Sequence, residues 1–199
     1  MMDYSIESLK YVIESNGGIV SAKKIAEEGI SRIALYQALI SGEIAKESHG
    51  NYILTNNQPD EYFMIQNRSP KIVFSHGTAL FLQGLSDSEP HELDITVPQG
   101  DNVSRIKRDY ENTRFHYCKK EIWDLGMINV VTPQGYKVQS YDLERSICEL
   151  MRDKKNVDQQ FYRQVMKKYF GDKCKPIKII KYAKQFNVED KVMAYMEVL

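Results

Sequence analysis

Apolar side chains near the N-terminus recur every three or four positions, which is the spacing of one face of a helix. This pattern predicts a first helix over residues 6–15, ended by two glycines. Ser21 and Ser31 each stand immediately before another such stretch, so we expect them to cap helices over residues 22–28 and 32–41. The N-terminal part is therefore predicted to hold three short helices in succession.

Two short strand-like stretches follow, over residues 44–47 and 52–55, separated by a turn that contains glycine. Three helices and a hairpin, with a short turn between the second and third helices, are typical of a winged helix-turn-helix. A small helical domain that binds a protein partner is the alternative. The polar, proline-containing stretch 56–60 predicts a linker, which places the domains at residues 1–57 and 58–199.

The second domain shows a mixed pattern of strands and helices. Alternation predicts strands over residues 93–97 and 113–118, and a hairpin formed by 128–131 and 136–139. A short helix is expected within 75–84, and further helices over 142–152, 158–170, 176–186 and 188–198. We therefore predict an α+β fold, with the N-terminal winged helix-turn-helix followed by a mixed α/β C-terminal domain that ends in a helical bundle.

The third helix carries side chains suited to reading DNA. If its apolar positions face the core, then Arg32, Ile33, Tyr36 and Gln37 face solvent. Arginine and glutamine make bidentate contacts to guanine and adenine edges in the major groove, and tyrosine reaches a phosphate or a thymine methyl. An ordinary solvated face is the alternative. The other candidate DNA contacts are Ser31, Lys23, Lys46, His49 and Asn51.

Charge is distributed unevenly along the chain. The 199 residues hold 27 acidic and 27 basic side chains, so the whole protein has no net field that attracts nucleic acid. Residues 1–57 hold 5 bases against 7 acids, a net charge of −2, which predicts weak DNA affinity for this part alone. Residues 146–199 hold 12 bases against 7 acids, a net charge of +5. The candidate C-terminal basic face, for phosphate contacts or for binding another acidic partner, consists of Lys167, Lys168, Lys175, Lys178 and Lys181.

Catalytic and metal chemistry receive little support from the sequence. Gly77 followed by Glu92 and Asp94 faintly resembles a nucleotidyltransferase, in which a Gly-rich loop precedes paired metal-binding carboxylates. No third carboxylate follows in the strand 113–118, so we expect no catalytic residues. The four histidines and three cysteines show no metal-ligand spacing, so we expect no metal and no cofactor. A signal peptide and a membrane span are also not expected, which favours a cytoplasmic protein.

Several runs resemble one known family. In the first domain they are Gly29-Ile30-Ser31-Arg32, Leu35, Leu39, Gly42 and Gly50-Asn51-Tyr52. In the second they are Ser75-His76-Gly77-Thr78-Ala79-Leu80, Gly84-Leu85-Ser86, Ile95-Thr96-Val97-Pro98, Tyr141-Asp142-Leu143-Glu144-Arg145-Ser146-Ile147-Cys148 and Lys181-Tyr182-Ala183-Lys184. Together they cover nearly the whole chain in the right order, and the chain resembles the AbiEi family, antitoxins of type IV toxin–antitoxin systems named for abortive phage infection.

The resemblance implies a repressor that binds inverted repeats in double-stranded DNA upstream of its own operon. It implies a monomer or weak dimer that binds DNA cooperatively, and a toxin of the nucleotidyltransferase type that the antitoxin need not touch. The basic face expected of such a protein is poorly developed in residues 1–57. Two alternatives stay open: an antitoxin that acts by protein interaction without operator binding, and a nucleotidyltransferase-like enzyme.

Overall fold

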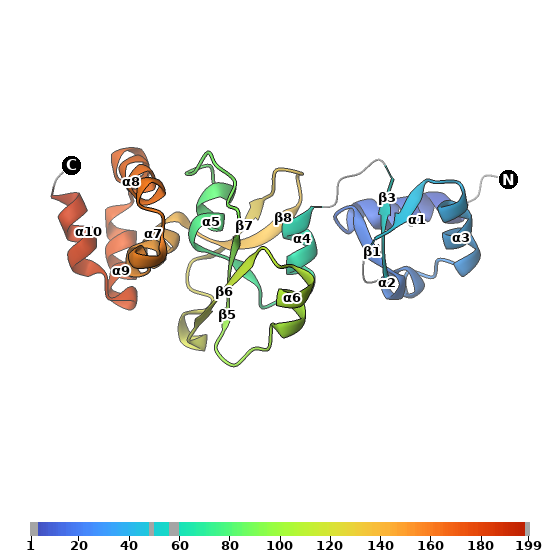
Figure 1. The fold of residues 1–199 in the computed structure, drawn as a ribbon, viewed down its shortest axis with the longest axis horizontal. Coiled ribbons are helices and arrows are strands. Elements are labelled where there is room, and N and C mark those ends of the chain that lie inside the picture. Colours follow the sequence, from blue (N-terminus) through green and yellow to red (C-terminus); the bar gives the residue numbers. More distant parts are fainter. Residues whose placement is uncertain (1–3, 48–49, 56–59, 198–199) are drawn as a thin grey trace. The chain divides into compact units, whose positions relative to one another are not determined.

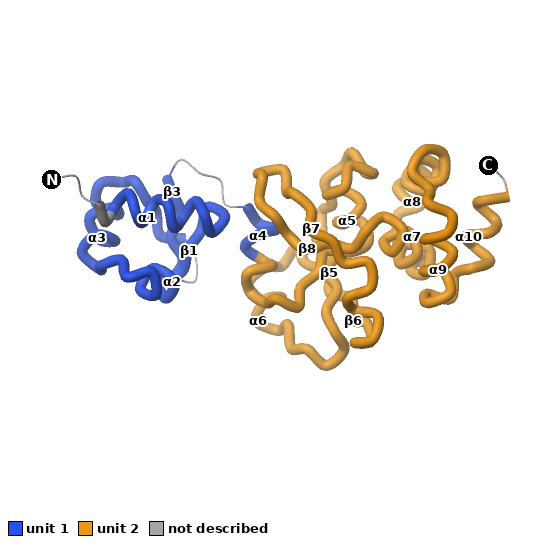
Figure 2. The backbone as a smooth tube through the Cα atoms, turned by 180° about the vertical axis from the view of Figure 1, so that it is seen from behind, with its two compact units in different colours: residues 1–64 blue, residues 65–199 orange. Residues whose placement is uncertain are grey.

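The computed structural model describes residues 4–47, 50–55 and 60–197. The chain divides into two compact units, residues 1–64 and 65–199 (Figure 2). The predicted domain boundary at residue 57 lies outside the described residues. Both units combine helices with a sheet, so the chain has an α+β fold with two separate sheets.

The described part of unit 1 contains three complete helices and a three-stranded antiparallel sheet of order β1-β3-β2 (Figure 1). Its elements are α1 (Tyr4–Ser15), β1 (Ile19–Ser21), α2 (Ala22–Glu27), α3 (Arg32–Ile40), β2 (Ile44–Lys46) and β3 (Asn51–Leu54), and α4 (Glu61–Gln66) spans the boundary to unit 2. The predicted helices and hairpin are confirmed. Strand β1 was not predicted; it pairs with β3 from Ile19 opposite Ile53 to Ser21 opposite Asn51.

The core of unit 1 forms where α1 packs against α2, α3 and the sheet. Leu9 and Ile13 on α1, Ile25 on α2 and Ala38 on α3 are almost fully buried together. The predicted N-caps are present, because the hydroxyl oxygen of Ser21 accepts the N–H of Lys24 and that of Ser31 accepts the N–H of Ala34, each at 3.1 Å. Local capping and a shared apolar face therefore account for this unit.

Unit 2 is built on a five-stranded mixed sheet of order β6-β5-β4-β8-β7. Its strands are β4 (Val73–Phe74), β5 (Leu93–Pro98), β6 (Thr113–Cys118), β7 (Met127–Val131) and β8 (Lys137–Tyr141). Strand β5 runs parallel to β6 and antiparallel to β4, whereas β4 runs parallel to β8. The predicted strands and the β7–β8 hairpin are confirmed, and the two-residue strand β4 at the centre of the sheet was not predicted.

The helices of unit 2 gather mainly beyond one end of the sheet (Figure 1). They are α5 (His76–Leu82), α6 (Ser104–Asp109), α7 (Leu143–Arg152), α8 (Gln159–Lys168), α9 (Pro176–Phe186) and α10 (Glu189–Met196), with short turns η2 (Lys120–Ile122), η3 (Lys154–Asn156) and the π-helical turn η4 (Tyr169–Lys173). Helix α7 packs against both α5 and α9, and a continuous apolar core joins α5 to α7–α10. The predicted C-terminal helical bundle is therefore present.

Several predicted boundaries differ from the structure by one or two residues. The helix expected to run to Phe170 ends at Lys168 and continues as the π-helical turn η4, which buries Tyr169 and Phe170. The helix expected to run from 188 to 198 covers Glu189–Met196. No helix in the described ranges is long and apolar enough to cross a membrane.

Candidate functional site

The turn between β4 and α5 is strained, and its residues belong to a network of polar side chains in unit 2. His76, the first residue of α5, has a φ of 46°, a left-handed conformation that is unusual for a residue with a side chain. The next residue is Gly77, whose N–H donates to Oδ2 of Asp94 at 3.2 Å. A Cβ on Gly77 would meet the same carboxylate oxygen at 3.2 Å, so the close approach favours glycine. The turn is therefore fitted closely to β5.

Asp94 connects this turn to the neighbouring strand β6. Its Oδ1 lies 2.8 Å from Nε2 of His116, while its backbone N–H donates to Oγ1 of Thr78 at 2.7 Å. The parallel register places His116 opposite Thr96, so Asp94 and His116 are diagonal neighbours on adjacent strands. The imidazole rings of His116 and His76 stack with their centroids 3.8 Å apart and their planes 17° apart.

His76 is buried and has one unsatisfied ring nitrogen. Only 3% of the residue is exposed, and Nε2 has no hydrogen-bond partner among the described residues. Its Nδ1 lies 3.0 Å from Oγ of Ser75 and 3.6 Å from Oε2 of Glu149. Burial, followed by the neighbouring His116, lowers the pKa of His76 to about 3. The ring is therefore neutral at physiological pH.

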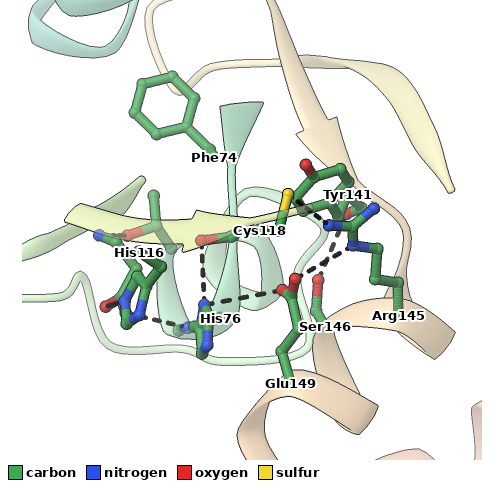
Figure 3. Close-up of polar contacts among 12 residues, drawn as sticks. Phe74, His76, His116, Cys118, Tyr141, Arg145, Ser146 and Glu149 are labelled. Atoms are coloured by element: carbon green, nitrogen blue, oxygen red, sulfur yellow. Dashed lines mark hydrogen bonds and ion pairs between the residues drawn. The ribbon is translucent and has the colours of Figure 1, made fainter. Parts of the chain in front are cut away.

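Behind His76, the buried side chains of Glu149 and Arg145 form an ion pair within α7 (Figure 3). Nε of Arg145 donates to Oε1 of Glu149 at 3.1 Å, and its Nη1 donates to the carbonyls of Ile122 and Leu125. The guanidinium also lies over the ring of Tyr141, 3.2 Å from its centroid. Each member of the pair thus has hydrogen-bond partners in the core, as buried charges require, although Oε2 of Glu149 has none among the described residues.

A pocket of about 340 Å³ opens beside the two stacked histidines. Its lining is rich in carboxylates: Glu89, Glu92, Asp94, Asp153 and Asp158. The basic and imidazole groups are Arg114, His76 and His91, and apolar walls come from Leu150, Val157 and Phe161. This composition favours a cation or a ligand with a positively charged group over an anion.

The structure brings together the residues of the faint nucleotidyltransferase resemblance. Gly77 contacts Asp94, as described above, and Glu92 lies on the same pocket wall. However, Glu92 forms an ion pair with Arg114. Strand β6 thus presents Arg114 and His116 beside these carboxylates. Two-metal chemistry would instead need a further carboxylate at this position.

In unit 1, α3 presents the predicted side chains to solvent. Arg32, Tyr36 and Gln37 are exposed, and Ala34 and Ala38 are buried on the opposite face. The hydroxyl of Ser31 is engaged as the N-cap, so this residue supports the helix start rather than standing free for a ligand. Ile40 was not predicted as part of this face. With Ile33 and Tyr36 it forms an exposed apolar stripe, in which Ile33 is 71%, Tyr36 65% and Ile40 70% exposed.

The other predicted DNA contacts of unit 1 are dispersed. Lys23 on α2 is exposed and lies 3.6 Å from Glu27, whereas Lys46 on β2 is exposed without an ion pair among the described residues. Asn51 begins β3 and is half-buried, with its carbonyl accepting the N–H of Glu47 at 2.8 Å. His49 lies outside the described residues. Arg32 and Tyr36 also line an apolar groove between α2, α3 and β3.

Two of the five lysines in the predicted C-terminal basic face, Lys168 and Lys178, form ion pairs. Nζ of Lys178 lies 2.9 Å from Asp142 and 3.2 Å from Glu144, and Lys168 lies 3.2 Å from Asp87. Although partial burial opposes it, pairing with these two carboxylates raises the pKa of Lys178. The fold therefore supplies Lys178 and Lys168 each with an acidic partner distant in sequence, and their role in a basic face stays a prediction. Lys167, Lys175 and Lys181 are exposed.

The sequence analysis missed His76, His116 and Asp153 as a group. These residues are separated by 40 and 37 positions, so no short motif connects them. Only the faint resemblance around Gly77, Glu92 and Asp94 and the alternation of β5 and β6 indicated a site in this part of the chain.

Comparisons with known proteins bear on the fold. No family model matches the chain, and no curated protein matches it. Among solved structures, the chain is similar to the RV2827C protein from Mycobacterium tuberculosis, with a TM-score of 0.60 and 8% sequence identity. The similarity covers 99% of this chain and 82% of the other. At this identity the similarity concerns the fold alone.

Proposed function

We propose that unit 1 is a winged helix-turn-helix that binds operator DNA and that the chain represses its own operon as a type IV antitoxin. The observation that carries this proposal is the exposed face of α3. Arg32, Tyr36 and Gln37 face solvent on a short helix whose opposite face is packed into a core. A recognition helix needs this arrangement, because its base-reading side chains must be free while the helix is held rigidly.

The order of elements supports the same assignment. Helix α2 ends at Glu27, a short turn follows, and the N-cap Ser31 starts α3. Strands β2 and β3 then form an antiparallel hairpin in which Ile44 lies opposite Leu54, in the position of a wing. If unit 1 is a winged helix-turn-helix, α3 enters the major groove of DNA. Arg32 and Gln37 then contact base edges, and Tyr36 contacts a phosphate or a thymine methyl.

Ion pairs explain why unit 1 would bind DNA weakly by itself. Lys10 is paired with Glu43, Lys23 with Glu27, and Lys24 with Glu28. Arg32 and Lys46 are the cations of the described part of unit 1 that have no acidic partner. Further phosphate contacts would therefore come from unit 2, where Lys167, Lys175 and Lys181 are exposed.

The antitoxin role follows from the resemblance to the AbiEi family rather than from a particular contact. We infer a toxin of the nucleotidyltransferase type encoded beside this gene, a cytoplasmic site of action, and no catalytic activity for the chain itself. The engagement of Glu92 by Arg114 and of Asp94 by His116 supports the absence of catalysis, since neither carboxylate is presented as an open metal ligand.

A second candidate function is supported by the apolar stripe of α3. Ile33, Tyr36 and Ile40 are spaced as one helical face and are exposed, and contiguous exposed apolar side chains mark protein-binding surfaces. An antitoxin that binds a protein through α3 would require these residues and would not require Arg32. Co-purification of the neighbouring toxin, abolished by Ile33→Asp but retained by Arg32→Ala, would favour this function.

Footprinting of the full chain on the DNA upstream of its own gene tests the leading proposal. We expect protection of inverted repeats, and a mobility shift at protein concentrations that leave random DNA of the same length unbound at moderate salt. Equal binding to both DNAs, without a protected repeat, would contradict operator recognition.

A further inference from the structure

Three potential metal ligands converge at the pocket of unit 2. His76, His116 and Asp153 each offer one donor atom, and these atoms all lie within 4.8 Å of one another. They come from the start of α5, from β6 and from the end of α7, so an ion here would join three elements. His76 is buried and both it and Asp153 line the pocket, which supplies access.

Each histidine has one nitrogen already engaged and one remaining. With its proton on Nδ1, which faces Oγ of Ser75 at 3.0 Å and the carboxylate of Glu149 at 3.6 Å, His76 has its lone pair at the buried, unsatisfied Nε2. An N–H at Nε2 of His116 donates to Asp94, which leaves Nδ1 as its lone-pair nitrogen. A carboxylate or hydroxyl partner on the second ring nitrogen is the usual support of a metal-binding histidine, because it sets the tautomer and the ring orientation.

We propose that His76, His116 and Asp153 bind a divalent transition-metal ion, of which Zn²⁺ is the representative. Two imidazoles and one carboxylate suit Zn²⁺ and related ions, whereas Mg²⁺ and Ca²⁺ prefer oxygen ligands throughout. Three protein ligands leave a coordination position toward the pocket for water or an exogenous ligand. This site goes beyond the proposed repressor function and does not depend on it.

The proposed site differs from the metal centre of a nucleotidyltransferase. There the paired carboxylates would bind the ion directly, whereas here Asp94 supports His116 and Glu92 is paired with Arg114. The carboxylate ligand is Asp153 at the end of α7, and Nδ2 of Asn156 holds its Oδ1 at 2.6 Å. The ligand set therefore includes no residue of the Glu92–Asp94 pair.

Metal binding requires a local rearrangement of the histidines. A ligated metal lies in the plane of each imidazole, and the rings of His76 and His116 are nearly parallel and stacked. The rings must therefore turn out of the stack as the donor atoms contract toward the ion, at about 2.0–2.1 Å for each nitrogen. The left-handed His76 lies at the turn where this movement would occur.

Titration of the purified, EDTA-stripped full chain with Co²⁺ and Zn²⁺ tests the proposal. We expect one ion per chain by calorimetry, a visible absorption band with Co²⁺, and a rise in Tm with Zn²⁺. His116→Gln and Asp153→Asn remove direct ligands and should weaken binding at least about 100-fold; Asp94→Asn removes a supporting partner and should weaken it about 10- to 100-fold.

His91→Gln is the matched control, because His91 lines the same pocket but is not one of the three ligands. This variant should bind Zn²⁺ as the wild type does. Circular dichroism of the metal-free variants confirms that each is folded, and His116 and Asp153 are chosen because both are partly exposed. The proposal is overturned if folded His116→Gln and Asp153→Asn retain wild-type affinity, if His91→Gln loses it, or if the wild type binds neither ion at submillimolar concentration.

Discussion

Glu149 accepts a hydrogen bond from Nε of Arg145 at 3.1 Å, and the two side chains are 2% and 0% exposed. The pair connects the helical bundle to the pocket, because the second carboxylate oxygen of Glu149 faces Nδ1 of His76 at 3.6 Å. Carbonyl groups of the segment 122–125 accept hydrogen bonds from Nη1 of Arg145, so this one side chain holds the connection between β6 and β7 against α7.

Removing Glu149 should therefore destabilise the chain strongly. Glu149→Leu leaves the Arg145 guanidinium buried without its counter-charge, and breaking a buried pair in this way costs about 3–5 kcal/mol. Urea denaturation, followed by Trp123 fluorescence, measures the change. Glu189→Gln is the control, because Glu189 and Lys184 form an exposed pair 4.0 Å apart, and it should leave the free energy of unfolding close to that of the wild type. A loss below about 1 kcal/mol for Glu149→Leu would refute the role of the pair.

Ser31 is expected to act through helix stability. Its hydroxyl caps α3, so Ser31→Ala should lower the free energy of unfolding by about 1 kcal/mol, whereas Ser31→Asn should retain the cap. Thermal unfolding by circular dichroism measures both variants. If DNA binding requires only that α3 is capped, Ser31→Asn should bind DNA with the affinity of the wild type. A folded and stable Ser31→Asn variant that has lost DNA binding would show instead that the hydroxyl contacts DNA.

Local signals explain why the helix starts were predictable. Ser21, Ser31, Asp142 and Asp158 all cap helices through hydrogen bonds to residues three positions ahead. Because these interactions are contained within one turn, the residue types and spacing suffice to predict them. The same holds for the β7–β8 hairpin, whose strands are separated by a short turn.

The pocket was less predictable because its contacts are non-local. The pairing of Asp94 with His116 depends on the parallel register of β5 and β6, and β4 is a two-residue strand without a readable alternation. The partners of Lys178, which are Asp142 and Glu144, lie on another helix. A net charge counted along the chain cannot show that a lysine is neutralised across the fold.

Alkaline pH should destabilise unit 2. Burial raises the pKa of both Cys148 and Tyr182 to about 12, from 9.0 and 10.0. A raised folded-state pKa contributes stability that is complete below the unfolded-state pKa and is lost as pH rises toward the folded-state pKa. The free energy of unfolding should therefore fall between about pH 9 and pH 12. Urea denaturation monitored by Trp123, the single tryptophan, reports this unit.

Cys148→Ala provides the comparison for the alkaline experiment. The substitution removes one of the protons that unfolding releases, so the decline of stability with pH should become shallower even though the variant is less stable at neutral pH. Unchanged stability of the wild type between about pH 8.5 and pH 11 would contradict the predicted proton release.

The exposed lysines of unit 2 should contribute to the salt dependence of DNA binding. Each phosphate contact that is lost lowers the slope of log K against log salt by about 0.9. The double variant Lys175→Ala/Lys181→Ala should therefore show a shallower slope. Lys178→Ala is the matched control and should keep the wild-type slope, because Asp142 and Glu144 already neutralise Lys178. Identical slopes for wild type and double variant would exclude these lysines from the DNA interface.

The preference of the full chain for its own upstream DNA over scrambled DNA tests operator recognition by α3 most directly. Fluorescence anisotropy should show tighter binding to the upstream DNA, and Arg32→Ala should weaken that binding by about 5- to 150-fold while affecting scrambled DNA less. Arg163→Ala, which removes an exposed arginine from α8 in unit 2, should preserve the preference. Equal affinity of the wild type for both DNAs, or an Arg32→Ala variant with an unchanged preference, would contradict the account.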